Sequence, residues 1–273
     1  MILRSEISRF INHDWKTYIT MLINQMRIDI RNRYMGTFFG FFWAVLNPLL
    51  FTAIYSLVIV FVFHAKLSTT STPLDYIVFM MSGLIPWLSF QEGVFSASNS
   101  VLANSNIVKN LPFPLEIFPL SGVLTSLVSL SVGLVLVFAG VLLAGRRFGL
   151  PLLFLPFAML IQVYFTLGFG FFLASLSVFI RDISQLLTYI FMIVLYLSPV
   201  VYDISMLPLK ILKQVSLVNP VYQFIAIYRG ILYNNQMPDL VGIAYLLAFS
   251  TLSLVIGYRF FRRTKVHFSD YLA

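Results

Sequence analysis

The fold of this chain is decided by the stretch Asp29-Ile-Arg-Asn-Arg-Tyr-Met-Gly-Thr-Phe-Phe-Gly-Phe-Phe-Trp-Ala-Val-Leu-Asn-Pro48. Its first five residues carry one carboxylate and two guanidinium groups, and no charged or histidine side chain then follows until His64. A charged collar in front of an apolar run of this length is typical of the place where a chain enters a lipid bilayer. Lys and Arg accumulate on the cytoplasmic side, so the stretch also predicts orientation, with the collar inside and His64 outside.

The composition of the whole chain is that of a membrane protein. Of its 273 residues, 59% are hydrophobic and only 10% are charged, whereas a soluble domain has about 25% charged residues. The net charge of +8 does not predict nucleic-acid binding, because the basic residues lie at the ends of apolar runs, where orientation and anionic lipid head groups account for them. The absence of Cys excludes disulfides, thiolate metal sites and Cys catalysis, and residues 1–33 lack the pattern of a cleavable signal peptide.

An amphipathic helix is predicted in front of the first apolar run. Between residues 2 and 30 the apolar side chains recur at steps of three and four, and basic side chains lie on or beside the other face. Such a helix can pack on a soluble core, but this chain offers none. We therefore expect residues 1–33 to form an amphipathic helix in the cytoplasmic membrane interface.

The remainder, residues 34–273, is predicted to be one all-α transmembrane domain with six spans. We place the spans at residues 38–63, 76–97, 117–144, 150–180, 183–202 and 239–258. Pro48 is expected to kink the first span, Pro86 to interrupt the second and Pro199 to break the fifth. With both termini inside, twelve of the 18 Lys and Arg residues fall on the cytoplasmic side and six outside, as the positive-inside rule requires.

Small residues predict close packing between helices. Gly36 and Gly40 form a GxxxG pattern at the inner end of the first span, and Gly145 and Gly149 enclose a tight outer turn. The third span carries a stripe of small residues on one face, which is typical of a helix that packs closely on a neighbour. The stripe consists of Gly122, Ser126, Ser129, Gly133 and Gly140.

Three polar residues in or beside the spans call for an explanation. Gln162 is expected near mid-membrane, and Glu92 near the inner end of the second span. Glu92 is interpreted as a snorkelled or paired structural carboxylate, with a functional role as the alternative, because charges within membranes are often functional. Asp182, with Gln185 three residues later, is interpreted as a capping box that starts the fifth span.

Two segments outside the regular spans are also expected to be helical. Residues 98–111 are rich in Ser and Asn but contain embedded apolar side chains, and Pro112 ends them; this pattern favours a short cytoplasmic helix over a plain loop. Residues 203–237 are apolar but interrupted, and predict two short helices that re-enter the outer leaflet and are split at Asn219-Pro220.

The sequence predicts no catalytic or metal site. It lacks the P-loop pattern for ATP and the H-E-x-x-H pattern for zinc, and Gly168-Phe-Gly170 is too short for a dinucleotide fingerprint. Few charges fall at mid-membrane, which disfavours an ion-coupled pump. We therefore interpret the chain as a transport pathway whose driving force is not generated by the chain itself.

Aromatic residues are the remaining feature, with 28 Phe, 14 Tyr and 3 Trp. Most are expected to face lipid or to line interfaces between helices. Some can face the interior, where rings stack on the apolar faces of sugars and Tyr hydroxyls bond sugar hydroxyls. The candidates for such a glycan channel are Phe38, Phe42 and Trp43 in the first span and Tyr189, Phe191 and Tyr196 in the fifth.

Several motifs occur in a characteristic order over nearly the whole chain. They are Asp29-Ile-Arg-Asn-Arg-Tyr34, Gly40-Phe-Phe-Trp-Ala-Val-Leu-Asn-Pro48, Gly83-Leu-Ile-Pro-Trp87, Asn106-Ile-Val-Lys-Asn-Leu-Pro-Phe-Pro-Leu-Glu116, Phe179-Ile-Arg-Asp182, Ser198-Pro199 and Asn219-Pro220. With these motifs the chain resembles the membrane subunit of the type-2 ABC exporters that move O-antigen, capsular polysaccharide or teichoic acid. Asn110 departs from the family pattern, which has a second basic residue beside Lys109.

The resemblance implies a bacterial inner-membrane homodimer that binds two copies of a separate ABC ATPase subunit. ATP and Mg²⁺ would then belong to that partner, and this chain would carry no cofactor. The substrate implied is a polysaccharide on undecaprenyl pyrophosphate, moved outward from the cytoplasm. Residues 98–111 would hold the coupling helix seated in the ATPase, and its contact residues would be Asn104, Ser105, Asn106, Ile107, Val108 and Lys109.

The basic collar fits this substrate, because guanidinium groups attract a pyrophosphate at the inner head-group level. Arg27, Arg31 and Arg33 are therefore candidates for receiving the lipid pyrophosphate, and orientation by positive charge is the alternative explanation of the same residues. Two other functions remain open. One is a type-2 ABC exporter of teichoic acid, a small lipid or a drug; the other is a membrane enzyme of lipid-linked sugar metabolism, which would need acidic pairs that the sequence lacks.

Overall fold

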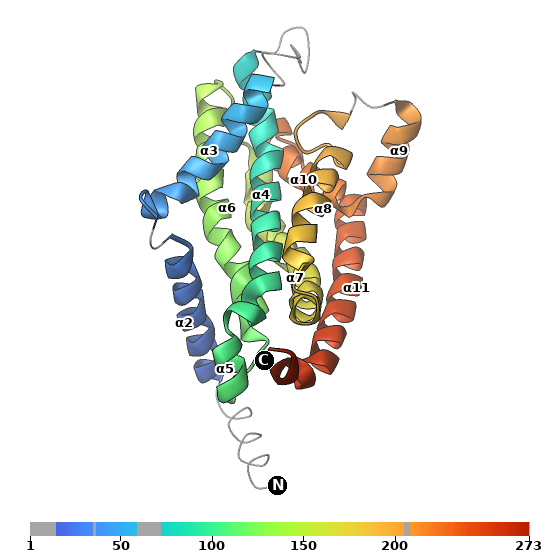
Figure 1. Cartoon of the computed structure of the whole chain (residues 1–273). Coiled ribbons are helices and arrows are strands. Elements are labelled where there is room, and N and C mark those ends of the chain that lie inside the picture. Colours follow the sequence, from blue (N-terminus) through green and yellow to red (C-terminus); the bar gives the residue numbers. More distant parts are fainter. Residues whose placement is uncertain (1–14, 35–36, 59–71, 205–207, 273) are drawn as a thin grey trace.

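The computed structural model of this chain describes residues 15–34, 37–58, 72–204 and 208–272, and within these ranges it is helical, without strands. Four of its helices are long and apolar enough to cross a membrane. The chain is thus a multi-pass helical protein (Figure 1), as the composition predicts. The first half of the predicted amino-terminal helix and residues 59–63 of the first predicted span lie outside the described residues.

The described helices differ widely in length, from single turns to rods of more than thirty residues. In chain order they are α2 (Trp15–Tyr34), η1 (Gly40–Phe42), α3 (Trp43–Ser56), α4 (Pro73–Ala103), α5 (Ser105–Asn110), α6 (Ile117–Leu143), η3 (Leu150–Phe154), α7 (Leu155–Phe179), α8 (Ile183–Leu197), α9 (Leu209–Val218), α10 (Pro220–Arg229), η5 (Gly230–Asn234), α11 (Leu240–Thr264), η6 (Lys265–His267) and α12 (Phe268–Tyr271).

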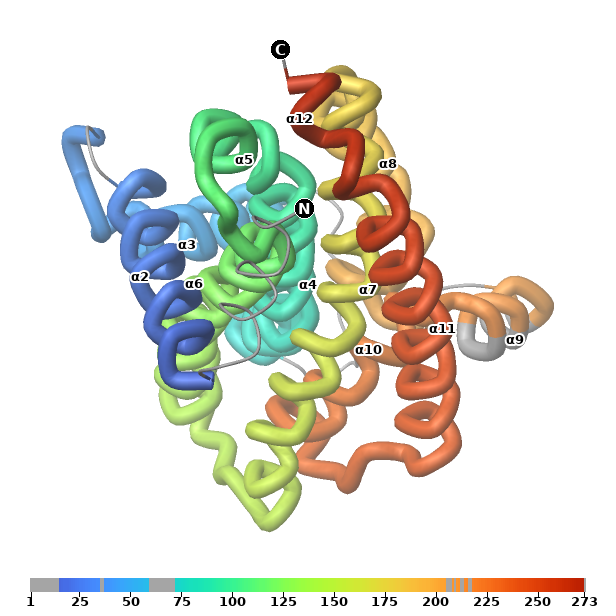
Figure 2. The backbone as a smooth tube through the Cα atoms, turned by 90° about the horizontal axis from the view of Figure 1, so that it is seen from below, coloured from blue at the N-terminus to red at the C-terminus, as the bar shows by residue number. Residues whose placement is uncertain are grey.

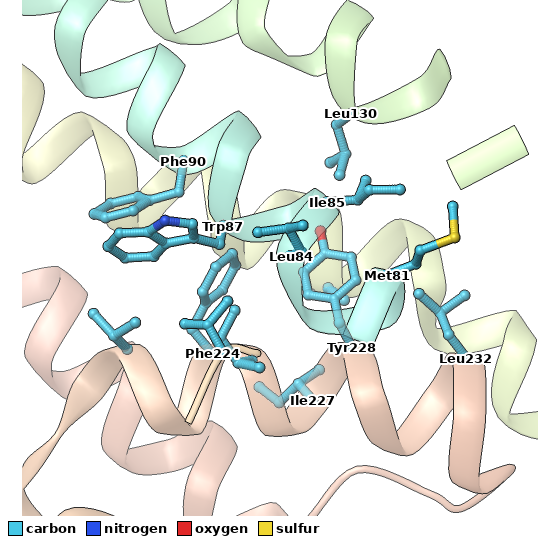
Figure 3. Packing of buried hydrophobic residues seen from close by; sticks show 14 of the residues in the cluster. Met81, Leu84, Ile85, Trp87, Phe90, Leu130, Phe224, Ile227, Tyr228 and Leu232 are labelled. Carbon is cyan, nitrogen blue, oxygen red and sulfur yellow. The ribbon is translucent and has the colours of Figure 1, made fainter. Parts of the chain in front are cut away.

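Helix α4 is the centre of the bundle. It packs against α6 and α7, and α11 packs on the far side of α7 (Figures 1 and 2). Most of its apolar window is buried, because α4 is apolar on every side and helices surround it. Figure 3 shows its side chains Leu84, Trp87 and Phe90 facing Phe224 and Tyr228 of α10.

Pro86 does not interrupt this helix, and that prediction is wrong. The α-helix continues from Pro73 to Ala103 through Pro86, which is itself buried. A proline within a spanning helix is tolerated where neighbouring helices enclose it, and α6 and α7 both pack against α4.

The predicted stripe of small residues on α6 packs against α4. A Cβ atom at Gly122 would lie 2.8 Å from the backbone nitrogen of Ala97, and one at Gly133 would lie 2.5 Å from the Ile85 side chain. The Ser89 hydroxyl of α4 donates to the Ser126 carbonyl of α6 at 2.9 Å. These helices therefore approach closely because α6 presents almost no side-chain volume along this face.

The helices in the first and fifth predicted spans are shorter than the other four. The apolar helices there are Gly40–Ser56 and Ile183–Leu197. Helix α8 ends at Leu197 rather than continuing to residue 202, because Pro199 cannot continue a helix and biases Ser198 toward the extended backbone seen there.

One local prediction in these regions is wrong, and a second finds no support among the described residues. Within the described part of the chain, no hydrogen bond from the Asp182 side chain caps α8; the Asp182 backbone carbonyl accepts from the nitrogens of Gln185 and Leu186 instead. Among the described residues, nothing lies within 4 Å of a Cβ atom placed on Gly40, whose φ of +50° shows that glycine serves the turn into η1 rather than close packing. Gly36 of the same pattern lies outside the described residues.

Two short helices follow α8, separated at Asn219 as the sequence predicts. Helix α9 stands off from the bundle in both views, whereas α10 returns to pack against α4 (Figures 1 and 2). The Asn219 side chain caps α10 by accepting from the backbone nitrogens of Val221 and Tyr222. Whether these helices re-enter a membrane stays a prediction.

The end of the bundle that carries α5 and the C-terminus, drawn at the bottom of Figure 1, is named the lower end. The predicted short helix within residues 98–111 is α5 alone, because Ser98 to Ala103 form the last turns of α4. A second apolar cluster lies at this end, in which Phe118, Phe261 and Phe268 are fully buried. This cluster fixes α5 and the C-terminal turns to the bundle.

Candidate functional site: a polar cavity beside the central helix

A cavity of about 910 Å³ lies on the side of α4 that faces α2 and α3. The end of α2 and the first half of α3 form two of its walls, and α4 forms the third, with Ser129 of α6 behind. It extends along α4 from Ile85 to Asn104, the residue that joins α4 to α5. The cavity therefore reaches toward the lower end of the bundle.

Amides, hydroxyls and aromatic rings make up much of the cavity wall. Within a chain that is 59% hydrophobic, this is an unusual concentration of polar groups. The amides and hydroxyls belong to Asn32, Thr37, Asn47, Ser89, Gln91, Ser96, Asn99, Ser100, Asn104 and Ser129, and the rings to Tyr34, Trp43, Phe51 and Phe95. Side chains of this kind offer hydrogen bonds to hydroxyl groups and flat apolar surfaces for stacking.

An ion pair spans the cavity between two helices. The guanidinium of Arg33, on α2, contacts the carboxylate of Glu92, on α4, and both side chains are about a quarter exposed. The hydroxyl of Ser129, on α6, donates to the same carboxylate oxygen at 2.9 Å. Glu92 is thus a paired carboxylate, as predicted, and it links three helices.

A second carboxylate fastens α2 to α6. The Asp29 carboxylate accepts from the Ser121 hydroxyl at 2.5 Å and from the Gln25 amide at 2.8 Å. Burial raises the pKa of Asp29 above its ordinary value, although both hydrogen bonds and the charge of Arg33 act in the opposite direction. Burial likewise lowers the pKa of Arg33, which still stays charged because arginine ordinarily titrates far above neutral pH.

The predicted basic collar does not come together as one site. Arg33 lines the cavity, whereas Arg27 and Arg31 are exposed and do not line it. The helical repeat explains the separation. Residues four apart share a face, so Arg27 and Arg31 lie together, but Arg33 follows Arg31 by only two residues and points to another face.

Of the six aromatic residues proposed for a glycan channel, only Trp43 lines the cavity. Phe38 and Phe42 are exposed beside it on η1 and the turn before it, and Tyr189 and Tyr196 are exposed on α8. Phe191 is buried and packs against Trp87, Phe90 and Phe95, so it belongs to the core of this chain.

The residues proposed to contact an ATPase divide between the two faces of α5. Ile107 and Val108 are partly buried and pack against the second apolar cluster, whereas Asn106 and Lys109 are exposed. Ser105 is partly buried, and Asn104 both starts α5 and lines the cavity. The apolar pair therefore anchors α5, and the polar pair stays exposed.

The polar wall of the cavity was not predicted. Asn47 and Gln91 fall within apolar segments, where an amide is costly unless it is buried against protein or faces water. That cost is a signal present in the sequence. What the sequence does not show is that residues far apart along the chain face the same cavity.

Residues 20–233 match the family described as ABC-2 type transporter. The chain is 27% identical over 246 residues to an O-antigen export system permease protein RfbA of Klebsiella pneumoniae, with 89% of this chain and 92% of that protein covered. It is 26% identical to an RfbA of Myxococcus xanthus (93% and 95% covered) and 21% identical to a polysialic acid transport protein KpsM of Escherichia coli (86% and 89% covered).

Proposed function

This chain belongs to the ABC-2 type transporter family, and on that premise we propose that it is the permease subunit of an ATP-driven exporter of lipid-linked polysaccharide. The relatives named for O-antigen export and polysialic acid transport support a polysaccharide as the cargo. The proposed carrier lipid is undecaprenyl pyrophosphate, and the proposed membrane is the bacterial inner membrane. Two copies of the chain would assemble with two copies of a separate ABC ATPase, which would bind ATP and Mg²⁺.

The observation that carries this proposal is the polar cavity. A channel for a hydrated sugar chain needs hydrogen-bond partners and stacking surfaces at membrane depth, and both cost free energy in a chain that otherwise buries apolar groups. The cavity wall offers amides, hydroxyls, Trp43 and Tyr34 within reach of the cation of Arg33. A small apolar drug would require none of these amides, so the wall favours a sugar-bearing cargo.

Helix α4 would transmit movement from the ATPase to the cavity. Its 31 residues give a rigid rod of about 46 Å at 1.5 Å per residue, and it joins α5 through Asn104 alone. A displacement of α5 by an ATPase would therefore be transmitted along α4 to the cavity wall. This is the physical basis on which a chain whose sequence lacks the P-loop pattern can use ATP.

The direct test is reconstitution. The chain and its candidate ATPase are placed together in proteoliposomes with a fluorescent undecaprenyl-linked glycan, and the ATP-dependent appearance of glycan on the opposite leaflet is measured. The proposal expects transport only with both proteins and hydrolysable ATP. It fails if the chain alone turns over the lipid-linked sugar, which would indicate an enzyme, or if a small lipid without glycan is moved equally well.

Lys109 provides the sharpest mutational test of coupling. Lys109→Glu reverses an exposed charge on α5, so it should weaken the contact with the ATPase and lower glycan transport about tenfold while the chain still folds. Val108→Pro should uncouple as well, because proline breaks α5. Arg147→Glu is the matched control, since it reverses an exposed charge at the opposite end of the bundle. Equal transport by Lys109→Glu and Arg147→Glu would argue against the role of α5.

A further inference from the structure

The charges that line the cavity do not favour an anion in this state of the chain. Three charged side chains line it, the carboxylates of Asp29 and Glu92 and the guanidinium of Arg33. The only cation among these lining residues is already in contact with Glu92. A phosphate-bearing head group would therefore approach a wall of net negative charge, and it can reach Arg33 only where Glu92 gives way.

The positions of the two carboxylates show which one can be displaced. Asp29 accepts two hydrogen bonds, from Ser121 and Gln25, whereas within the described residues Glu92 accepts one, from Ser129, besides its contact with Arg33. The Glu92 side chain is 28% exposed, so its carboxylate remains open to water once it leaves Arg33. A phosphate offers a guanidinium more charge and more acceptor oxygens than a carboxylate does.

We propose that Glu92 is a displaceable counter-ion, which neutralises Arg33 in the unloaded chain and yields it to the phosphate of an anionic lipid head group that binds in the cavity. This inference rests on the proposed function, because the lipid-linked cargo supplies the head group. Glu92 thereby becomes a determinant of which head groups enter, since a ligand without phosphate cannot replace it.

The same exchange changes how α2 is held. In the unloaded chain α2 is tied to α4 by Arg33 and Glu92, and to α6 by Asp29 and Ser121. When Glu92 is displaced from Arg33, α2 loses its ion pair with α4 but keeps its hydrogen bond to α6. Loading of the cavity is in this way communicated to α4, the helix that leads to α5.

The test measures binding to the full-length chain in phosphatidylcholine nanodiscs, with undecaprenyl diphosphate as the probe and thermal stability measured in parallel. Glu92→Gln keeps an acceptor for Ser129 but removes the charge that competes for Arg33, so the dissociation constant should fall about tenfold. Arg33→Gln should raise it about tenfold, and the double variant should bind like Arg33→Gln alone. Both single variants should lower the stability of the chain without ligand, because each breaks the same ion pair.

For Glu92→Gln the proposal thus predicts tighter binding of the probe together with lower stability, and this combination distinguishes a displaceable counter-ion from a purely structural ion pair. A structural pair predicts that Glu92→Gln weakens binding together with stability, and that result, or an unchanged dissociation constant, would overturn the proposal. The matched control is Asp75→Asn, which removes the pairing of Asp75 with Arg146 at 3.0 Å at the other end of α4. It should lower stability and leave binding of the probe unchanged; tighter binding by Asp75→Asn would also count against the proposal.

Two further ligands identify the source of the phosphate. Undecaprenol lacks phosphate and should bind without any response to Glu92→Gln; a tenfold response with undecaprenol would overturn the role of charge. Phosphatidylglycerol carries a single phosphate: a response equal to that of undecaprenyl diphosphate assigns the site to phospholipid head groups in general, and a weaker one assigns it to the diphosphate. Because no ATPase is present, these results stand apart from any failure of glycan export.

Discussion

Gln162 illustrates how single polar side chains organise the interior of this protein. Its amide nitrogen donates to the Ser89 hydroxyl at 3.1 Å, and its amide oxygen accepts from the Tyr228 hydroxyl at 2.6 Å. Gln162 lies on α7, Ser89 on α4 and Tyr228 on α10, and all three side chains are buried. A buried amide that satisfies partners on two other helices fixes their register, because any shift would leave a polar group unpaired.

Replacement of Gln162 by Leu should therefore destabilise the chain mainly through Tyr228. The Tyr228 hydroxyl would lose its acceptor inside the core, at a cost of about 1–2 kcal/mol in the free energy of unfolding. The double variant Gln162→Leu/Tyr228→Phe removes both partners and should recover part of that loss. Thermal unfolding in detergent measures Gln162→Leu, Tyr228→Phe and the double variant, and strictly additive losses would show that the two side chains are not coupled.

Asp29 predicts a dependence of stability on pH. Burial raises its pKa in the folded chain above the unfolded value of 3.8, so the folded chain binds a proton more tightly than the unfolded chain does. Stability due to Asp29 should therefore increase as the pH falls from neutral through the folded pKa, and the increase should end below the unfolded value. The unfolding midpoint of the wild-type chain should rise on acidification relative to that of Asp29→Asn.

Ser121→Ala provides the companion measurement for this dependence. The Ser121 hydroxyl stabilises the ionised carboxylate, so its loss should raise the pKa of Asp29 further and make the pH dependence steeper. A pH profile of Asp29→Asn that matches the wild-type profile would contradict the assignment. It would mean that another group causes the dependence.

The sequence predicts correctly that a charged side chain within an apolar segment must be paired, because the free-energy cost of leaving it unpaired depends only on that segment. It does not predict which residue is the partner when that residue lies far away along the chain. A carboxylate in an apolar run must be paired, and Glu92 is paired. Its partner, Arg33, lies on a different helix, and only the packed structure shows that α2 brings it there. The helical repeat places Arg33 on a different face from Arg27 and Arg31, whereas the prediction of one basic site considers only that the three residues are close in sequence.

At the scale of helices, each predicted apolar segment contains a helix within its described residues, four of them long enough to cross a membrane, but the predicted ends differ from the observed ones. Hydropathy and small residues are properties of a segment, and they correctly predicted the packing face of α6 and the break at Asn219. Proline was a less consistent guide. Pro199 ends α8, whereas Pro86 is accommodated within α4, since neighbouring helices enclose α4 and can satisfy its backbone.

The C-terminal turns are the element that hydropathy did not predict. Helix α12 packs beside α5, and Phe268 is fully buried in the cluster against which Ile107 and Val108 pack. The Lys265 ammonium contacts the Glu116 carboxylate at 2.5 Å, which ties the C-terminal turns to the start of α6. The C-terminal turns thus support α5 by packing against it.

Removal of this packing contact should make α5 open more often to solvent. Phe268→Ala deletes a fully buried ring, which typically costs about 3–5 kcal/mol in a core, and in this chain the loss should be felt first in the small cluster at the lower end. Amide hydrogen exchange in Ser105–Asn110 should rise, while exchange within α7 stays near its wild-type rate. Tyr271→Ala, on the same short helix but 55% exposed, is the control and should leave α5 protected. Equal exchange in the two variants would show that α12 does not support α5.

At the scale of the whole molecule, the two ends of the bundle have different constructions. The lower end joins α5, η6 and α12 over the second apolar cluster, and the other end of the bundle, drawn at the top of Figure 1, carries α9 and the turn that follows α6. Helix α4 passes between them with the polar cavity on one side and the main apolar core on the other. The two ends therefore present different surfaces, and the orientation of the bundle decides which end faces a partner ATPase.

The absence of cysteine from the sequence allows that orientation to be measured directly. Asn106→Cys and Arg147→Cys each place one thiol at an exposed position, the first on α5 and the second in the turn after α6. The positive-inside rule predicts that a membrane-impermeant maleimide labels Arg147→Cys from outside the cell, and Asn106→Cys only after the membrane is opened. The wild-type chain, which has no thiol, gives the background, and both variants should react fully in detergent. Labelling of Asn106→Cys in intact cells would place α5 on the wrong side for an ATPase, and the transport scheme could not then operate through this helix.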